Sequence, residues 1–167
     1  TDGFADTLDG FFCGGEREKK LEVMKDSRMG AFGTMGIVML LILKWSLLFS
    51  LSSTDISYAL LTFPVISRWI ITIAIVYFPY IRSNGLGKAF RAGCDYSRSL
   101  FSTMLTIIIV YFIAGLQGLV AGLFALIIAL MFLWYSIKQI GGLTGDIYGA
   151  VNEIGEVVVL SVFNILS

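Results

Sequence analysis

Histidine is absent from this chain of 167 residues, and cysteine occurs only twice. Without histidine, the sequence lacks the commonest general base of proteins and one of their commonest metal ligands. Cys13 and Cys94 do not have the spacing of a metal site, and they suggest no disulfide framework. Any chemistry carried by these residues is therefore expected from carboxylates and cationic side chains.

Charged residues are also scarce, because Asp, Glu, Lys and Arg make up only 14% of the chain while hydrophobic residues make up 57%. The formal net charge is zero, so there is no electrostatic basis for binding nucleic acid. A soluble domain of this size seldom has so few charges. The composition predicts an all-α, polytopic helical bundle in a membrane, with the lipid bilayer as a partner.

Several apolar segments approach the ~20 residues that a helix needs to cross a bilayer. We expect five membrane-spanning or membrane-embedded helices, at residues 34–51, 57–79, 100–115, 118–137 and from 146 to the C-terminus. Residues 1–33 form a polar motif segment before the bundle of residues 34–167, and residues 1–167 are interpreted as one integral membrane domain. Because the chain begins at Thr1 inside an apparent motif, further helices are expected upstream.

The lysines and arginines predict the orientation of the helices. Ten of the twelve lie before the first span, between the second and third, or between the fourth and fifth: Arg17, Lys19, Lys20, Lys25, Arg28, Arg82, Lys88, Arg91, Arg98 and Lys138. The other two connections contain neither residue type. The positive-inside rule then places the N-terminal segment and both cation-rich connections in the cytoplasm. We therefore expect a multi-pass protein of the cell's inner membrane, with its active site on the cytoplasmic face.

Three aspartates recur in the opening stretch DGFADTLDGF. On a helix, Asp2, Asp6 and Asp9 fall within about 60° of one another, and the large apolar residues project from the opposite side. Like charges at this spacing repel, so a divalent cation is expected to offset them. The alternative interpretation is helix capping and solvation, which accounts for one aspartate more easily than for three.

A second acidic motif, TGDIYGAVNEIGE, begins the last predicted helix. Asp146, Glu153 and Glu156 fall within about 80° on that helix, and the preceding glycine-rich turn can direct backbone N–H groups at a phosphate. A charge inside the membrane costs roughly 2.5–3.5 kcal/mol even on a mild scale, so such groups line a cavity or pair with one another. Lys44 and Arg68 lie within predicted spans, where the alternative is that they pair with Glu153 or Glu156 and hold the bundle together.

Two carboxylate groups at one membrane face, together with nearby cations, favour divalent-metal-assisted phosphoryl transfer. That reaction needs ligands for Mg²⁺ and cations for phosphate, and it asks little covalent chemistry of the protein. The planar guanidinium of Arg68 suits phosphate recognition. Arg82 and Lys88, in the loop RSNGLGK, are further candidates for binding an anionic substrate.

The motifs also resemble those of one known family. The stretches DGFADTLDGFF and REKKLEVMKDSRMGAFG are similar to the hallmark of the adenosylcobinamide-GDP ribazoletransferases, also called cobalamin-5′-phosphate synthases. The closing GGLTGDIYGAVNEIGEVVVL and the central SRWIITIAIVYFPYIRSNGLGKAF resemble later parts of the family pattern, in the same order. One departure is that a histidine, which the family has just before the first motif, would lie upstream of Thr1.

The resemblance implies an enzyme of late cobalamin assembly. The ribose hydroxyl of α-ribazole, or of its 5′-phosphate, would attack the phosphate of adenosylcobinamide-GDP, releasing GMP and forming adenosylcobalamin or its 5′-phosphate with Mg²⁺ as cofactor. The implied catalytic residues are Asp6, Asp9, Asp26 and Arg28. The implied substrate-binding residues are Lys25, Ser27, Arg68, Arg82, Lys88 and Thr144. The implied metal ligands are Asp2, Asp6, Asp9, Asp146, Glu153 and Glu156. A homo-oligomer, or association with other enzymes of cobamide assembly, is a further expectation.

Two alternatives differ from this interpretation in specific residues. A CDP-alcohol phosphotransferase also uses a membrane-embedded aspartate motif, but its pattern has arginine directly after the alanine where this chain has Asp6 after Ala5. A cation channel or transporter with carboxylates along its path would leave the first acidic helix and the MKDSR element without a role.

Overall fold

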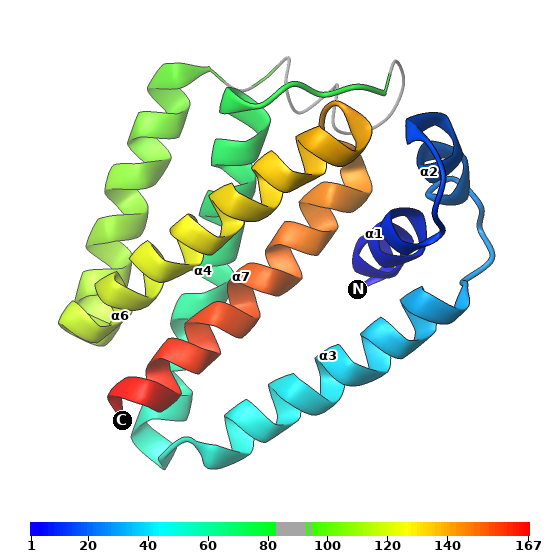
Figure 1. Cartoon of the computed structure of the whole chain (residues 1–167). Coiled ribbons are helices and arrows are strands. Elements are labelled where there is room, and N and C mark those ends of the chain that lie inside the picture. Colours follow the sequence, from blue (N-terminus) through cyan, green and yellow to red (C-terminus); the bar gives the residue numbers. More distant parts are fainter. Residues whose placement is uncertain (83–92, 94) are drawn as a thin grey trace.

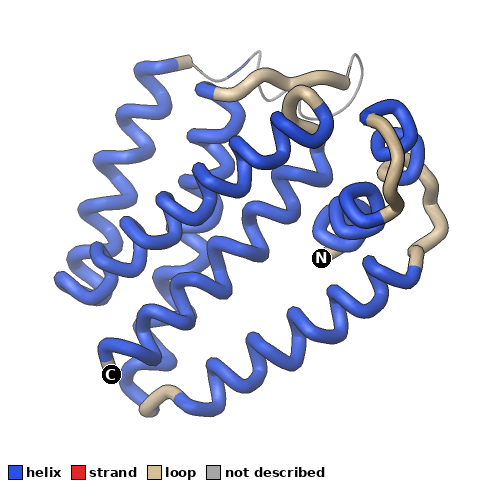
Figure 2. Tube along the Cα trace, in the orientation of Figure 1, coloured by secondary structure: helices blue, strands red, loops and turns tan. Residues whose placement is uncertain are grey.

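The structure is a computed structural model, and it describes residues 1–82, 93 and 95–167. The described residues form six helices and no strand (Figure 1, Figure 2). The helices are α1 (Asp2–Phe12), α2 (Arg17–Val23), α3 (Ala31–Ser50), α4 (Ser53–Tyr77), α6 (Tyr96–Ile140) and α7 (Gly145–Leu166). The predicted substrate-binding residue Lys88 and the cysteine Cys94 lie outside the described residues.

Four of the helices in the described part of the chain, α3, α4, α6 and α7, are long and apolar enough to cross a membrane. Helix α6 has 45 residues, which at 1.5 Å per residue would extend for about 67 Å, twice the thickness of the hydrocarbon core. It folds back on itself at Gly115 (φ 55°, ψ −140°), so its two halves correspond to the two spans predicted there (Figure 1). The prediction of an all-α polytopic bundle is therefore confirmed.

Polar caps define where the spans begin. The side chains of Ser52, Asp95 and Thr144 each accept a hydrogen bond from the backbone nitrogen three residues later, at the start of α4, α6 and α7. Helix α6 ends at Gly141, whose left-handed backbone (φ 82°) closes the last turn. The turn from α6 to α7 is therefore tight, and it places Thr144 and Asp146 at a defined end of the bundle.

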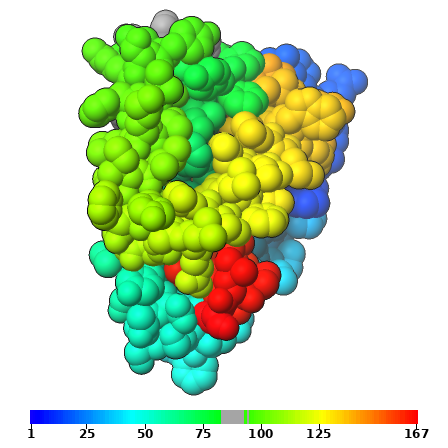
Figure 3. Space-filling model, turned by 90° about the vertical axis from the view of Figure 1, so that its left-hand side faces the viewer, coloured from blue at the N-terminus to red at the C-terminus, as the bar shows by residue number. Residues whose placement is uncertain are grey.

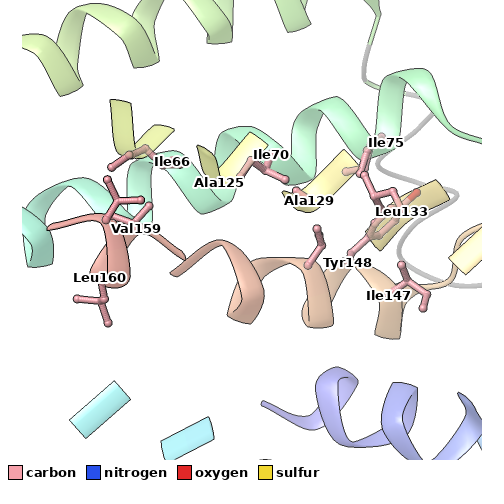
Figure 4. Packing of buried hydrophobic residues seen from close by; sticks show 14 of the residues in the cluster. Ile66, Ile70, Ile75, Ala125, Ala129, Leu133, Ile147, Tyr148, Val159 and Leu160 are labelled. Carbon is pink, nitrogen blue, oxygen red and sulfur yellow. The ribbon is translucent and has the colours of Figure 1, made fainter. Parts of the chain in front are cut away.

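The core lies where α4, α6 and α7 pack together (Figure 4). Ile66 and Ile70 of α4 meet Ala125 and Ala129 of α6, and Val159 of α7 packs in the same layer, all of them fully buried. Small side chains on α6 let the helices approach closely, as is usual between membrane helices. The outward surface of α6 carries large apolar side chains instead, and α6 forms much of the face of the molecule that Figure 3 shows.

Helix α1 does not lie apart from the bundle but fits between α3 and α7 (Figure 1). Glycines make this position possible. A Cβ atom at Gly3 would lie 2.8 Å from the Cα atom of Asp146, and a Cβ atom at Gly149 would lie 3.3 Å from the Cα atom of Gly3. On the other side, Gly36 of α3 faces Leu8 of α1. The first acidic motif is therefore packed directly against the second.

The connections alternate between the two ends of the bundle as the cation pattern predicts. The α2–α3 connection, the end of α4 and the α6–α7 turn lie at one end, whereas the α3–α4 turn and Gly115 lie at the other (Figure 1). Both acidic motifs begin toward the first end. That this end faces the cytoplasm stays a prediction from the positive-inside rule.

The close contact of Gly3 in α1 with the start of α7 gives a test of the fold. We expect Gly3→Ala to lower the free energy of unfolding by about 1–3 kcal/mol, because the new methyl group meets backbone atoms that cannot move without separating the helices. The matched control is Gly122→Ala, whose methyl group would make ordinary contacts 3.7 Å from Ile66. Thermal unfolding of the detergent-solubilised protein measures both, and equal melting temperatures for the two variants would contradict the close crossing.

Candidate active site at the crossing of α1 and α7

Carboxylates from the two ends of the sequence come together where α1 crosses the start of α7. Asp2 and Asp6 project from α1, and Asp146 projects from the first turn of α7, beside the contact of Gly3 with Gly149. The pKa of Asp6 is raised from 3.8 to about 6, first because the side chain is partly buried and then because Asp146, Asp2 and Asp9 repel its negative charge. The crossing is therefore a region of concentrated negative charge.

Arg82 is the cation that offsets part of this charge. Its Nη2 atom lies 2.6 Å from Oδ2 of Asp146, and it also donates to the backbone carbonyl of Met24 at 3.3 Å. Thr144 adds a hydrogen bond to the same Asp146 oxygen at 3.3 Å while capping α7. Two predicted substrate-binding residues, Arg82 and Thr144, thus lie beside a predicted metal ligand.

The backbone after α4 holds Arg82 in this place. The amide of Leu143 donates to the carbonyl of Pro79 at 2.7 Å, and the amide of Ile81 donates back to the carbonyl of Leu143 at 3.0 Å. This short parallel pairing ties the residues after α4 to the α6–α7 turn. The side chain that follows the pairing, Arg82, is therefore directed at the start of α7.

Asp9 has a different environment from the other two aspartates of α1. Its side chain is buried, and its two oxygens accept hydrogen bonds from the amides of Gly30 and Gly33, both at 2.8 Å. These amides belong to the first turn of α3, where backbone N–H groups have no partner within their own helix. Asp9 therefore caps α3 and not its own helix, α1. The capping interpretation thus holds for one of the three aspartates.

Glu153 and Glu156 form an ion-paired network with groups from α3 and α4. The Nζ atom of Lys44 lies 2.5 Å from Glu153 and 2.6 Å from Glu156. Asn152 donates to Glu156 at 2.8 Å and accepts a hydrogen bond from Arg68. The backbone nitrogen of Thr1 lies 3.0 Å from the other oxygen of Glu153, which places the start of α1 beside this network. The geometry therefore agrees with the alternative given by the sequence, in which Lys44 pairs with Glu153 or Glu156 and holds the bundle together.

The MKDSR element lies on the connection between α2 and α3. Lys25, Ser27 and Arg28 are exposed, and Arg28 forms an ion pair with Asp26 at 2.7 Å. The hydrogen bonds from Arg28 lower the pKa of Asp26 to about 2. Within the part of the chain that the structure describes, no ion pair joins these four side chains to the carboxylates of α1 or α7. The element contacts the site through its first residue, Met24, whose backbone carbonyl accepts a hydrogen bond from Arg82.

The six predicted metal ligands thus differ in the groups with which they interact. Among residues 1–82, 93 and 95–167, no group of three or more Asp, Glu, Cys or His side chains is arranged to hold a metal ion by itself. Asp9 is taken by backbone amides, Glu153 and Glu156 by Lys44, and Asp146 by Arg82. Asp2 and Asp6 complete the set, and across the described residues they have neither a hydrogen bond nor an ion pair through their side chains.

Some residues of the site were not identified from the sequence. Asn152 bridges Arg68 to Glu156, and the carbonyl of Met24 accepts from Arg82. An amide residue four positions before a glutamate inside an apolar helix is a signal that points to Asn152. The Met24 carbonyl has no such signal, because a backbone group acquires a tertiary partner only through the packing of distant segments.

The cap at α3 gives a second test. We expect Asp9→Ala to lower the free energy of unfolding by about 1–3 kcal/mol, because it leaves two buried amides of α3 without acceptors. Asp26→Ala is the matched control, since exposed ion pairs add little stability. Chemical or thermal unfolding compares the two, and a loss no larger for Asp9→Ala than for the control would show that the cap is dispensable.

The raised pKa of Asp6 predicts a stability that depends on pH. The proton is held more tightly in the folded state, so the charged form opposes folding as pH rises from 3.8 through about 6. We expect Asp6→Asn to raise the melting temperature at pH 8 in the absence of divalent cations, with the gain shrinking between pH 6 and pH 4. Asp26→Asn is expected to have the opposite sign, because the pKa of Asp26 is lowered. A gain for Asp6→Asn that does not change with pH would contradict the electrostatic origin.

Comparisons with known proteins agree with the arrangement of these motifs. A family model described as cobalamin-5-phosphate synthase matches residues 1–164. Proteins named adenosylcobinamide-GDP ribazoletransferase are similar along the chain: one from Desulfitobacterium hafniense is 38% identical over 164 residues, covering 95% of this chain and 65% of that protein. One from Herpetosiphon aurantiacus is 40% identical over 162 residues, covering 96% of this chain and 64% of that protein.

The chain thus spans about 65% of the length of a curated relative that it matches. No solved structure matches it. Because the family model covers nearly every residue, including both acidic motifs, the chain belongs to the cobalamin-5-phosphate synthase family.

Proposed function

We propose that this chain forms the membrane-embedded catalytic part of an adenosylcobinamide-GDP ribazoletransferase. It would join α-ribazole, or its 5′-phosphate, to adenosylcobinamide-GDP and release GMP, at the cytoplasmic face of the inner membrane. The observation that carries the proposal is the meeting of Asp2 and Asp6 of α1 with Asp146 of α7 beside Arg82. Membership of the family supports the reaction, and the charges at the crossing suit a phosphoryl-transfer site.

The reaction makes modest demands on the protein. The oxygen of a ribose hydroxyl forms a bond to the phosphorus that carries cobinamide, the bond from that phosphorus to the bridging oxygen breaks, and GMP leaves with the electron pair. The hydroxyl proton needs an acceptor with a pKa near the working pH. Asp6 meets this requirement, because its pKa is about 6 and it has no ion-pair partner among the described side chains.

Arg82 would bind phosphate oxygens. Its guanidinium already contacts the oxygen of Asp146 at 2.6 Å, and a planar guanidinium can bind a phosphate through two parallel hydrogen bonds. Arg28 and Arg68 are proposed to neutralise charge on the leaving GMP, as the resemblance implies. Arg28 is exposed on the connection before α3, so this role requires substrate to reach that connection.

Mg²⁺ is the proposed cofactor, and the oxygen ligands at the crossing suit it. Mg²⁺ in phosphoryl-transfer sites is usually bound through one or two protein carboxylates together with waters and substrate phosphates. Asp2 and Asp146 would hold it, which agrees with the finding that the described residues contain no group of three ligands. When bound, it would neutralise phosphate charge. Both carboxylate oxygens of Asp9, Glu153 and Glu156 already accept hydrogen bonds, whereas among the described residues only Oδ2 of Asp146 does, so the proposal narrows the predicted ligand set.

Two other functions are not favoured. A CDP-alcohol phosphotransferase and a cation channel were the alternatives from the sequence, but the family match covers residues 1–164 and includes every motif on which the proposal depends. A homo-oligomer, or association with other enzymes of cobamide assembly, remains an expectation from the resemblance alone.

A GMP-release assay tests the proposal. The intact protein, reconstituted in membranes, is supplied with adenosylcobinamide-GDP and α-ribazole while Mg²⁺ is titrated. We expect Asp6→Asn to lower kcat by about 10²–10⁴-fold, the usual contribution of a positioned base. The matched control is Asp55→Asn at the opposite end of the bundle, which is expected to keep its activity. Near-normal release of GMP by Asp6→Asn, or release by the wild type that needs no divalent cation, would refute this assignment.

A further inference from the structure

Helix α3 has little packing of its own against the rest of the bundle. Gly33 and Leu40 are its buried residues, and most of its other side chains are exposed. A cavity of about 720 Å³ separates it from α7, lined almost entirely by apolar side chains such as Leu43, Val157 and Val158. In a membrane, apolar surface by itself does not drive helices together, because lipid tails are equally apolar. Because α3 buries few side chains, its polar contacts contribute much of its attachment to α7.

Those polar contacts are few, and Lys44 makes the charged ones. Its ammonium group bridges Glu153 and Glu156 of α7 at 2.5 and 2.6 Å, with all three side chains largely buried. At the far end of α3, Asn164 of α7 donates to the carbonyl of Leu47 at 2.9 Å. A cation shared by two carboxylates at membrane depth is hard to replace, because separating the charges would leave each of them unpaired in lipid.

The side chains of the network around Lys44 carry equal numbers of positive and negative charges. Arg68 joins it through Asn152, which accepts from the arginine and donates to Glu156. Two cations therefore accompany the two glutamates, and no ion from solvent is needed to balance them. At the crossing of α1 and α7, by contrast, Arg82 is the one cation among the described side chains that interacts with Asp6 and Asp146. The two sets of carboxylates thus differ in the charge that the protein itself supplies.

We infer that Lys44 is a positioning residue, which holds α3 against α7 and thereby keeps Asp2 and Asp6 of α1 against Asp146. Helix α1 lies between α3 and α7 (Figure 1), and Asp9 of α1 caps the first turn of α3. Phe4 of α1 also lines the cavity between α3 and α7. An outward movement of α3 would therefore remove one of the two helices that enclose α1. The meaning of this position for catalysis rests on the proposed function.

The competing interpretation is that Glu153 and Glu156 bind the catalytic cation and that Lys44 only fills their place. Three variants separate the two: Lys44→Arg keeps the cation, Lys44→Met removes it, and Lys44→Met combined with Glu153→Gln removes one charge of each sign, which leaves Glu156 linked to Arg68 through Asn152. Ser46→Ala, on the same helix and cavity wall, is the matched control. A distance between α1 and α7 is measured by spin labels on Cys13 and on Ile165→Cys, in a Cys94→Ser background, since both labelled positions are exposed.

If Lys44 positions α1, Lys44→Met broadens this distance distribution and lowers kcat for GMP release by about 100-fold, the size expected for misplacing reacting groups by an ångström. Lys44→Arg and Ser46→Ala retain a narrow distribution, and the double variant recovers a narrow distribution and at least a tenth of wild-type kcat. An inactive Lys44→Met with an unchanged distance would overturn the inference. So would a double variant that is well packed but as inactive as Lys44→Met, because Glu153 would then act in the reaction.

Two further outcomes also decide the matter. If Lys44→Met does not fold, the double variant must still fold, because its remaining side-chain charges, on Glu156 and Arg68, balance each other; failure of both would overturn the inference. If the wild type itself releases no GMP, the proposed function fails, and the distance measurements alone then show whether Lys44 sets the position of α1.

Discussion

The close crossing of α1 and α7 is the constraint on which the rest of the site depends. Two glycines, Gly3 and Gly149, meet there; a side chain at Gly3 would force the helices apart, and one at Gly149 would make a tight contact 3.3 Å from the Cα atom of Gly3. Without that contact, the carboxylates of Asp2 and Asp6 would have no fixed relation to Asp146, although more than a hundred residues of sequence lie between them. Glycine on the other flank, at Gly36, lets α3 close the slot from the opposite side.

A second constraint is that charges within a membrane protein need partners. The structure meets it in different ways for different acids: backbone amides for Asp9, an ammonium for Glu153, and a guanidinium for Asp146. Asp2 and Asp6 are the exceptions, since neither side chain has a hydrogen bond or an ion pair among the described residues, and burial together with acidic neighbours raises the pKa of Asp6 to about 6. Groups with perturbed pKa values tend to mark functional sites. The proposed role of Asp6 as a proton acceptor rests on this property.

The different partners of these acids change how the two acidic motifs are interpreted. The acidic residues of each motif look equivalent in the sequence, yet one aspartate of the first motif caps α3, and two glutamates of the second pair with Lys44. Acids with structural partners and acids proposed to act in the reaction therefore occur within the same short motif. A motif that is rigidly spaced along the chain can owe part of that spacing to the packing of a neighbouring helix.

The sequence by itself determined the helical membrane class, the positions of the spans and the family, because these follow from apolar run lengths, from the placement of lysine and arginine, and from long motifs. It also placed Asp2 and Asp6 on one side of a helix. Only the tertiary structure decided that Asp9 caps α3, that Asn152 links Arg68 to Glu156, and that Arg82 reaches Asp146. Helical periodicity sets the direction of a side chain on its own helix, whereas its partner depends on how helices cross, and that is decided by packing between segments distant in the chain.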